Sequence, residues 1–234
     1  FLRAAMAQRK TRIRIAPSPV KIKPDGERYS KFLVSLPFDL TVSQKKALAN
    51  IFADTEKEHP MSRLLQGDVG TGKTVVALGL AAAAADAGVQ TAIMAPTEIL
   101  ADQIYSGAEK FLSAAGIRCG LLKGGQGGPT KTRLLEEIKR GEIDVVVGTH
   151  ALLGKATEFF RLGAVIIDEQ QRFGVAQRGE MLNTGEIPHF LMMSATPIPR
   201  TVSALLFGDL DISLLRESPS GKRKKETRLI DYGR

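Results

Sequence analysis

Hydrophobic residues in this chain fall into short runs that alternate with longer segments of helical character. Apolar runs typical of buried strands lie near residues 62–66, 91–95, 117–122, 143–148, 163–167 and 189–194. Helical patterns lie before, between and after them, near residues 42–52, 73–87, 98–115, 131–139, 175–182 and 199–206. This alternation predicts an α/β fold with a mainly parallel sheet and helices on both faces.

The N-terminal 35 residues differ from this alternating body. They carry nine Lys/Arg against two Asp/Glu, and residues 1–14 have helical spacing. Three prolines and Asp25-Gly26 follow, which disfavour helix through residue 30. We therefore expect residues 1–35 to form a basic helix and linker that belong to a preceding domain.

The C-terminal end is basic again and rich in turn residues. Residues 216–234 hold seven Lys/Arg against three Asp/Glu, whereas the domain expected over residues 36–215 is slightly acidic. Two basic ends on a nearly neutral body indicate contact with a polyanion, although solvated tails have the same composition. Because the chain starts at Phe1 and ends without a closing element, we expect it to be a piece of a longer protein.

Composition excludes several other classes of protein. The chain is 43% apolar and 25% charged, and no run approaches the ~18 apolar residues of a membrane span. Cys119 is the single cysteine, and the three histidines show no spacing typical of metal ligands. We expect a cytoplasmic protein without a membrane segment or structural zinc, and its oligomeric state stays open.

The most informative motif is a glycine-rich loop between a predicted strand and a predicted helix. Residues 67–74 match G-x-x-x-x-G-K-[ST], a loop that holds the phosphates of a nucleotide. Its residues are Gly67, Asp68, Val69, Gly70, Thr71, Gly72, Lys73 and Thr74. We expect Lys73 to contact the β- and γ-phosphates and the Thr74 hydroxyl to hold Mg²⁺.

Two acidic residues end a predicted buried strand. Asp168 and Glu169 follow the apolar run 164–167, which is the arrangement of a second nucleotide-site motif. Asp168 is expected to hold Mg²⁺ through water, and Glu169 to polarise the water that attacks the γ-phosphate. This pair favours a nucleotide hydrolase over a small-molecule kinase, which has to exclude water.

Three further strand ends carry hydroxyl groups. They are the segments Pro96-Thr97, Thr149-His150 and Ser194-Ala195-Thr196. Taken singly, Thr97 and Thr149 are well explained as ordinary helix N-caps, and the 194–196 pattern is weak. Their order around the two nucleotide motifs is more specific than any one of them.

Together these motifs resemble the RecG family of bacterial DNA helicases, in superfamily 2. The resemblance rests on residues 65–74, 94–101, 147–152, 168–175 and 195–201. It implies a RecA-like P-loop NTPase domain that uses ATP and Mg²⁺ and acts on branched double-stranded DNA. It also implies a wedge-like domain before this one and a second RecA-like domain after it.

The same resemblance gives roles to individual residues. Phe38 and Gln44 would bind adenine, by stacking and through the side-chain amide. DNA contacts would come from Pro96, Thr97, Thr149 and His150. Coupling between hydrolysis and DNA would use Gln170, Gln171, Ser194, Ala195 and Thr196. Gln171 departs from the family, which usually has a histidine there; an amide cannot become cationic near neutral pH.

Two other functions fit the motifs less well. An Mfd-like transcription-repair coupling translocase shares most of them, but residues 66–70 and 208–211 are more similar to RecG. A nucleotide-binding interaction module without turnover would agree with Gln171. The missing second domain would supply arginine fingers, so we expect the isolated chain to hydrolyse ATP poorly.

Overall fold

The computed structural model describes residues 19–125, 127–154, 156–168, 187–195 and 210–217, which form one α/β unit. Its helices are α2 (Glu27–Ser35), α3 (Val42–Thr55), α4 (Lys73–Asp86), α5 (Glu98–Leu112) and α6 (Pro129–Lys139), with short 3₁₀ helices η1 (Ser113–Ala115) and η2 (His150–Leu153). Its strands are β1 (Ser62–Gly67), β2 (Gln90–Met94), β3 (Cys119–Leu122), β4 (Val145–Gly148), β5 (Leu162–Asp168), β6 (His189–Ser194) and β7 (Asp211–Leu215). None of the helices within these ranges has the length and apolar character that a membrane crossing needs.

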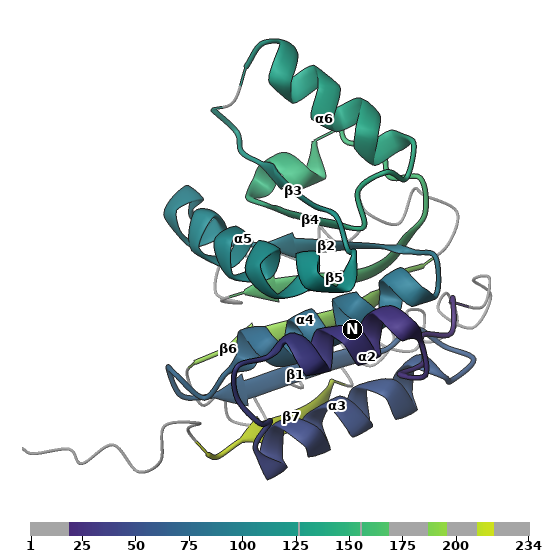
Figure 1. Ribbon diagram of the computed structural model, residues 1–234, viewed down its shortest axis with the longest axis vertical. Helices are drawn as coiled ribbons and strands as arrows, with labels where there is room; N and C mark the ends of the chain where they lie inside the picture. Colours follow the sequence, from purple (N-terminus) through teal and green to yellow (C-terminus); the bar gives the residue numbers. More distant parts are fainter. Residues whose placement is uncertain (1–18, 126, 155, 169–186, 196–209, 218–234) are drawn as a thin grey trace, which may run out of the picture.

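All seven strands belong to one parallel sheet (Figure 1). The strand order is β3-β4-β2-β5-β6-β1-β7, and every neighbouring pair is parallel. The carboxyl ends of all seven strands therefore lie at one edge of the sheet. The predicted fold class, a RecA-like domain with a mainly parallel sheet, is confirmed.

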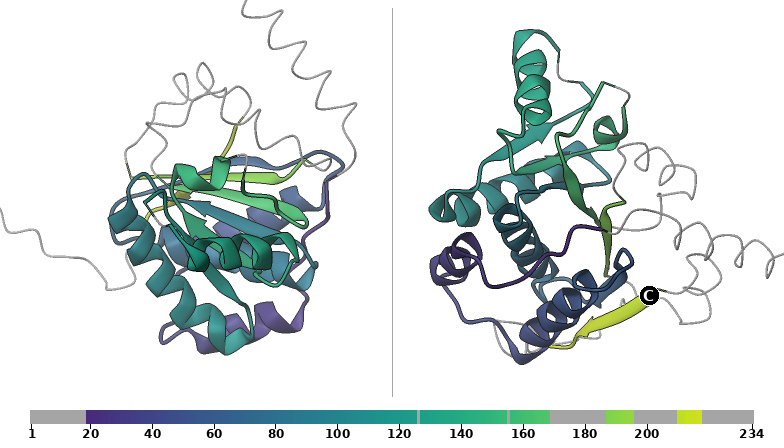
Figure 2. Two further views of the ribbon diagram at one scale, coloured as in Figure 1. Left: turned by 90° about the horizontal axis from the view of Figure 1, so that it is seen from above. Right: turned by 90° about the vertical axis from the view of Figure 1, so that its right-hand side faces the viewer.

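Each face of the sheet has its own hydrophobic core. One core joins the sheet to helices α2, α3, α4 and α5, which gather on one side in Figure 2. The other core includes apolar residues of α6 and η2. Strand residues alternate between the cores: Leu65 and Ile166 belong to the first, Leu64 and Val165 to the second. This agrees with the predicted helices on both faces, since a parallel sheet buries both sides.

Helix α4 lies at the centre of the first core because its side chains are small. Residues 75–85 are all buried, and most of them are alanines, which allow neighbouring elements to approach closely. At Gly79 a Cβ atom would come within 2.9 Å of a Leu48 methyl group on α3. The helix that follows the phosphate loop is therefore held firmly by its surroundings.

The prediction of a helix-free linker through residue 30 is wrong. Helix α2 begins at Glu27, and its Phe32 is completely buried in the first core. The helix starts there because Asp86 accepts hydrogen bonds from the backbone N–H groups of Arg28 and Tyr29, at 3.0 and 2.8 Å. A Cβ atom at position 26 would overlap the Asp86 carboxylate, so Gly26 makes this approach possible.

Strand β7 was not among the predicted strands. It lies at the edge of the sheet beside β1. A buried ion pair between Arg63 and Asp54 supports it, since Arg63 Nη1 also donates to Ser213 Oγ of β7 at 2.9 Å. The expected helices over residues 1–14, 175–182 and 199–206 lie outside the described residues.

Candidate nucleotide site

The phosphate loop joins the end of β1 to the start of α4, as the motif predicts. Gly67 ends the strand and Lys73 begins the helix, while Gly72 has a φ of 78°, which favours glycine. Thr71 closes the turn: its backbone N–H and its hydroxyl both donate to the Asp68 carbonyl, at 3.2 and 2.8 Å. A helix N-terminus behind such a loop forms an anion site.

Lys73 and Thr74 lie together in the first turn of α4. Lys73 Nζ donates to the carbonyl oxygens of Gly67 at 2.7 Å and Asp68 at 3.1 Å, so its ammonium group lies over the loop. A Cβ atom at Gly67 would come within 2.6 Å of Thr71 Oγ1, which leaves no room for a side chain. An ammonium group, a hydroxyl and a helix N-terminus in one place fit a triphosphate with its divalent cation.

Asp168 and Ser194 lie at the same edge of the sheet as this loop. Asp168 ends β5 and Ser194 ends β6, and β6 separates β5 from β1. In register, Asp168 is opposite Met193, and Gln66 is opposite Ser194. Two strand spacings amount to about 10 Å between the backbones of β5 and β1. The sheet thus brings the second nucleotide motif to the phosphate loop.

Gln44, in the first turn of α3, is completely buried against the phosphate loop. Its Oε1 accepts from the Thr41 backbone N–H at 2.9 Å, in a capping box that makes Thr41 the N-cap of α3. Its Nε2 donates to the Thr71 carbonyl at 2.9 Å. The amide expected to bind adenine therefore also ties the start of α3 to the loop.

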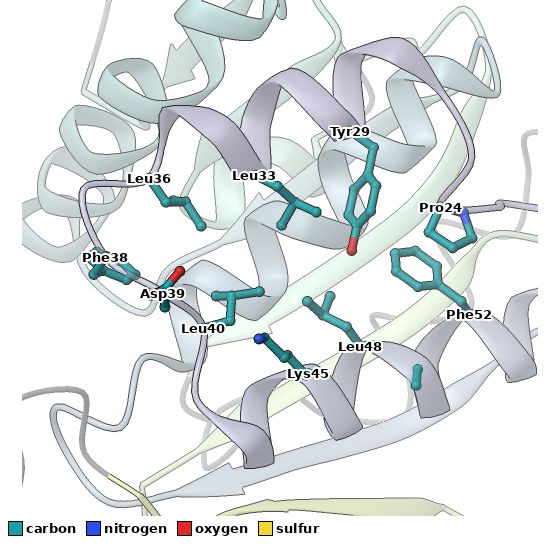
Figure 3. A pocket seen from close by; sticks show the side chains of 11 residues that line it. Pro24, Tyr29, Leu33, Leu36, Phe38, Asp39, Leu40, Lys45, Leu48 and Phe52 are labelled. Atoms are coloured by element: carbon teal, nitrogen blue, oxygen red, sulfur yellow. The ribbon is translucent and has the colours of Figure 1, made fainter.

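Phe38 lies on the segment that connects α2 to α3, and its ring contacts Phe111 with 6.3 Å between ring centroids. It lines a cavity of about 510 Å³ between the two helices (Figure 3). Figure 3 shows Pro24 and Phe52 at one end of the cavity and Phe38 at the other. No residue of the phosphate loop lines this cavity, so it is separate from the predicted triphosphate site.

The residues expected to contact DNA lie at the carboxyl ends of β2 and β4. Thr97 precedes α5, and its hydroxyl accepts from the Leu100 N–H at 3.3 Å, as an ordinary N-cap does. Pro96 is half-buried beside it, Thr149 is buried before η2, and His150 is exposed. Strands β2 and β4 are neighbours, so these two segments lie side by side.

Several predicted site residues lie outside the described part of the chain. These are Glu169, Gln170, Gln171 and Thr196, whereas Ala195 is described and half-buried. Among the described residues, no group of three metal-binding side chains is present. Burial raises the pKa of the Cys119 thiol to about 12, which makes it a poor nucleophile.

Comparison with known proteins agrees with these motifs and their geometry. Residues 41–205, more than half of the chain, match the DEAD/DEAH box helicase family. The chain belongs to this helicase family. RecG of Streptococcus pneumoniae is 45% identical over 224 residues, which cover 95% of this helicase chain and 33% of that relative. RecG of Thermotoga maritima is 45% identical over 226 residues, which cover 97% and 29%.

Solved structures show the same relationship. A RecG structure bound to a three-way DNA junction superposes with a TM-score of 0.80 at 42% identity, covering 94% of this helicase chain and 29% of that one. The DEAD-box helicase Mss116, bound to single-stranded RNA and UDP-BeF, has a TM-score of 0.61 at 21% identity and covers 81% and 43%, so it shares the fold. The expected resemblance to RecG is confirmed, although the helicase chain spans about a third of those relatives.

Proposed function

We propose that this chain is the first RecA-like motor domain of a RecG-like DNA helicase. The whole protein would use ATP to move on and remodel branched double-stranded DNA, such as forks and Holliday junctions, in recombination and repair. The observation that carries the proposal is the shared sheet edge. The phosphate loop begins at the end of β1, Asp168 ends β5, and β6 is the one strand of the sheet between β1 and β5. The similarity to RecG supports DNA as the polymer.

The nucleotide would bind with its phosphates in the loop. Lys73 would exchange its two carbonyl partners for phosphate oxygens, and the N-terminus of α4 would add backbone N–H donors. Thr74 and Asp168 offer the oxygen ligands that Mg²⁺ prefers. When bound, the ion would neutralise charge on the β- and γ-phosphates.

Residues beside these ligands would carry hydrolysis and its coupling to DNA. Glu169 would accept a proton from the attacking water. Ser194 is the last residue of β6, and β6 lies between β5, which ends at Asp168, and β1, which leads into the phosphate loop. A change at the phosphates could therefore reach the 194–196 segment directly. Gln170 and Gln171 would take part through hydrogen bonds of their amides.

Adenine would bind on the side of the loop that faces α3. Gln44 Nε2 bonds to the Thr71 carbonyl, and the amide would bind the base beside this contact. Phe38 is partly exposed and could stack on the ring. Both residues lie in or just before α3, on the N-terminal side of the phosphate loop.

DNA would lie along the carboxyl ends of β2 and β4. Thr97 accepts from Leu100 through a lone pair, which leaves its own hydroxyl hydrogen for a phosphate oxygen. Thr149, His150 and Pro96 would complete the contact with the backbone. Contacts of this kind position the protein on DNA and do not read its sequence.

The experiment that tests this function is ATP hydrolysis by the intact protein, with and without forked DNA. We expect DNA to stimulate hydrolysis, and both Lys73→Ala and Glu169→Gln to abolish that stimulation. Lys139→Ala is the matched control, because Lys139 is an exposed lysine at the end of α6 that pairs with Glu158 at 2.6 Å. Its activity should equal that of the wild type.

Other outcomes would favour other functions. Tight ATP binding without turnover under any DNA condition would favour an interaction module. Stimulation that needs RNA polymerase would favour an Mfd-like translocase. The isolated chain should hydrolyse ATP slowly even if the proposal is correct, since an arginine finger supplied by a second domain contributes about 10³–10⁵ in rate.

A further inference from the structure

Glu217 connects the end of the sheet to the beginning of α3. It is the second residue after β7, and its carboxylate Oε2 accepts from the Ser43 backbone N–H at 3.1 Å and from the Ser43 hydroxyl at 3.2 Å. The two residues are 174 positions apart in the sequence. A distant part of the chain thus supplies a cap for this helix.

This cap satisfies a donor that α3 does not satisfy itself. The first N–H groups of a helix have no partner within it. In α3 the Gln44 N–H donates to Thr41 Oγ1 at 3.3 Å, and the Lys45 N–H donates to the Thr41 carbonyl at 3.0 Å. The Ser43 N–H donates to Glu217. The first turn of α3 has no acidic residue of its own, so Glu217 provides the anion that this end of a helix favours.

The capped turn is the one that contacts the phosphate loop. Gln44 follows Ser43 directly, and its Nε2 holds the Thr71 carbonyl at 2.9 Å. The sheet connects the end of β7 to the phosphate loop a second time, because Leu215 of β7 pairs in register with Gly67. A Cβ atom at Gly67 would come within 2.9 Å of Leu215 Cβ. The segment that leaves β7 is thus joined to the loop at two points.

We propose that Glu217 is a positioning residue of the nucleotide site. It holds the first turn of α3 so that Gln44 stays on Thr71, and it thereby ties the chain that leaves β7 to the phosphate loop. ATP affinity then depends on a residue that acts through Ser43 and Gln44. This inference rests on the proposed function, namely that the loop binds ATP.

Titration of the intact protein with a fluorescent ATP analogue and Mg²⁺ tests the proposal. We expect Glu217→Ala to weaken binding by about three- to tenfold, the range that corresponds to loss of a helix cap. Glu217→Gln should restore most of the affinity, because its amide oxygen still accepts from Ser43. In a Gln44→Ala background, Glu217→Ala should cause no further loss, since the two residues act in one chain of contacts.

Glu158→Ala is the matched control. Glu158 is an exposed glutamate whose ion pair with Lys139, at 2.6 Å, lies away from the phosphate loop, so this variant should bind like the wild type. Thermal unfolding of each variant shows whether the fold is kept. Unchanged affinity in Glu217→Ala, or losses that add in the double variant, would overturn the positioning role. A wild-type protein that does not bind the analogue would instead refute the proposed function itself.

Discussion

His189 is a buried histidine whose two ring nitrogens have different hydrogen-bonding roles. Nδ1 accepts from the Met61 backbone N–H at 2.9 Å, so Nε2 carries the hydrogen and donates to the Val20 carbonyl at 2.8 Å. Burial lowers the pKa of His189 from its ordinary 6.5. Protonation of Nδ1 would also remove the acceptor for Met61. The folded protein therefore holds this side chain in its neutral form.

The stability of the protein should depend on pH for this reason. The unfolded chain binds a proton on His189 near pH 6.5, while the folded chain binds it only at lower pH. The contribution of neutral His189 to the free energy of unfolding is fully present above about pH 6.5. It falls as the pH drops through the folded pKa, by at most about 1.4 kcal/mol per pH unit. Urea unfolding between pH 5 and 8 measures it. His189→Gln should reduce this slope, whereas replacing the exposed His150 by Gln should keep it.

The residues of the phosphate loop could be predicted because their chemistry is local. Gly72, Lys73 and Thr74 are adjacent, and their spacing alone requires a turn that leads into a helix. The contacts of Gln44 could not be predicted in the same way. Its bond to Thr71 joins residues 27 positions apart and exists only because α3 packs beside the loop.

Among the elements, helix α2 could not be predicted from the local composition. Proline and glycine near residue 25 indicated a linker, and they do end just before the helix begins at Glu27. What the sequence did not reveal is the cap from Asp86, 58 positions away from Arg28. Strand β7 could not be predicted for a similar reason, because it depends on pairing with β1 and on the Arg63 contact to Ser213.

Asp86 should therefore control how firmly α2 is held. We expect Asp86→Ala to lower the free energy of unfolding by about 1–2 kcal/mol, because two backbone N–H groups at the start of α2 lose their acceptor. Hydrogen exchange of the Arg28 and Tyr29 amides should become faster in the same variant. Asp102→Ala serves as a control: Asp102 pairs with Lys123 at 2.9 Å outside α2, so exchange in α2 should stay unchanged.

At the scale of the whole molecule, the sequence predicted six of the seven strands but not their order in the sheet. The order follows from packing between distant segments, and it places β6 between β5 and β1. This order explains why Asp168 and Ser194 lie near the phosphate loop along the edge that all the strand ends share. The motifs predicted a shared site for Gly67 and Asp168, which are 101 positions apart in the sequence. The parallel sheet brings the two segments to the same edge, since all strand ends lie there.

The distribution of charge leads to a prediction about the intact protein. Residues 216–234 carry seven Lys/Arg against three Asp/Glu, and this segment follows directly on β7. If this segment contacts DNA, affinity for a forked duplex should fall steeply as salt rises, because bound cationic groups displace counterions. Replacing Lys224 and Lys225 by glutamine should reduce the slope of log K against log salt by up to about two.

Lys139, the last residue of α6, and Arg140, directly after it, provide a control that distinguishes contact with DNA from an effect of net charge. Lys139 pairs with Glu158 at 2.6 Å, and Arg140 pairs with Glu142 at 2.7 Å, so their charges are already neutralised locally. Replacing both by glutamine removes the same formal charge as the Lys224 and Lys225 changes. The salt slope should then stay as in the wild type, because neither residue releases counterions from DNA. Equal slopes in all three proteins would mean that the basic C-terminal segment stays in solvent when DNA binds.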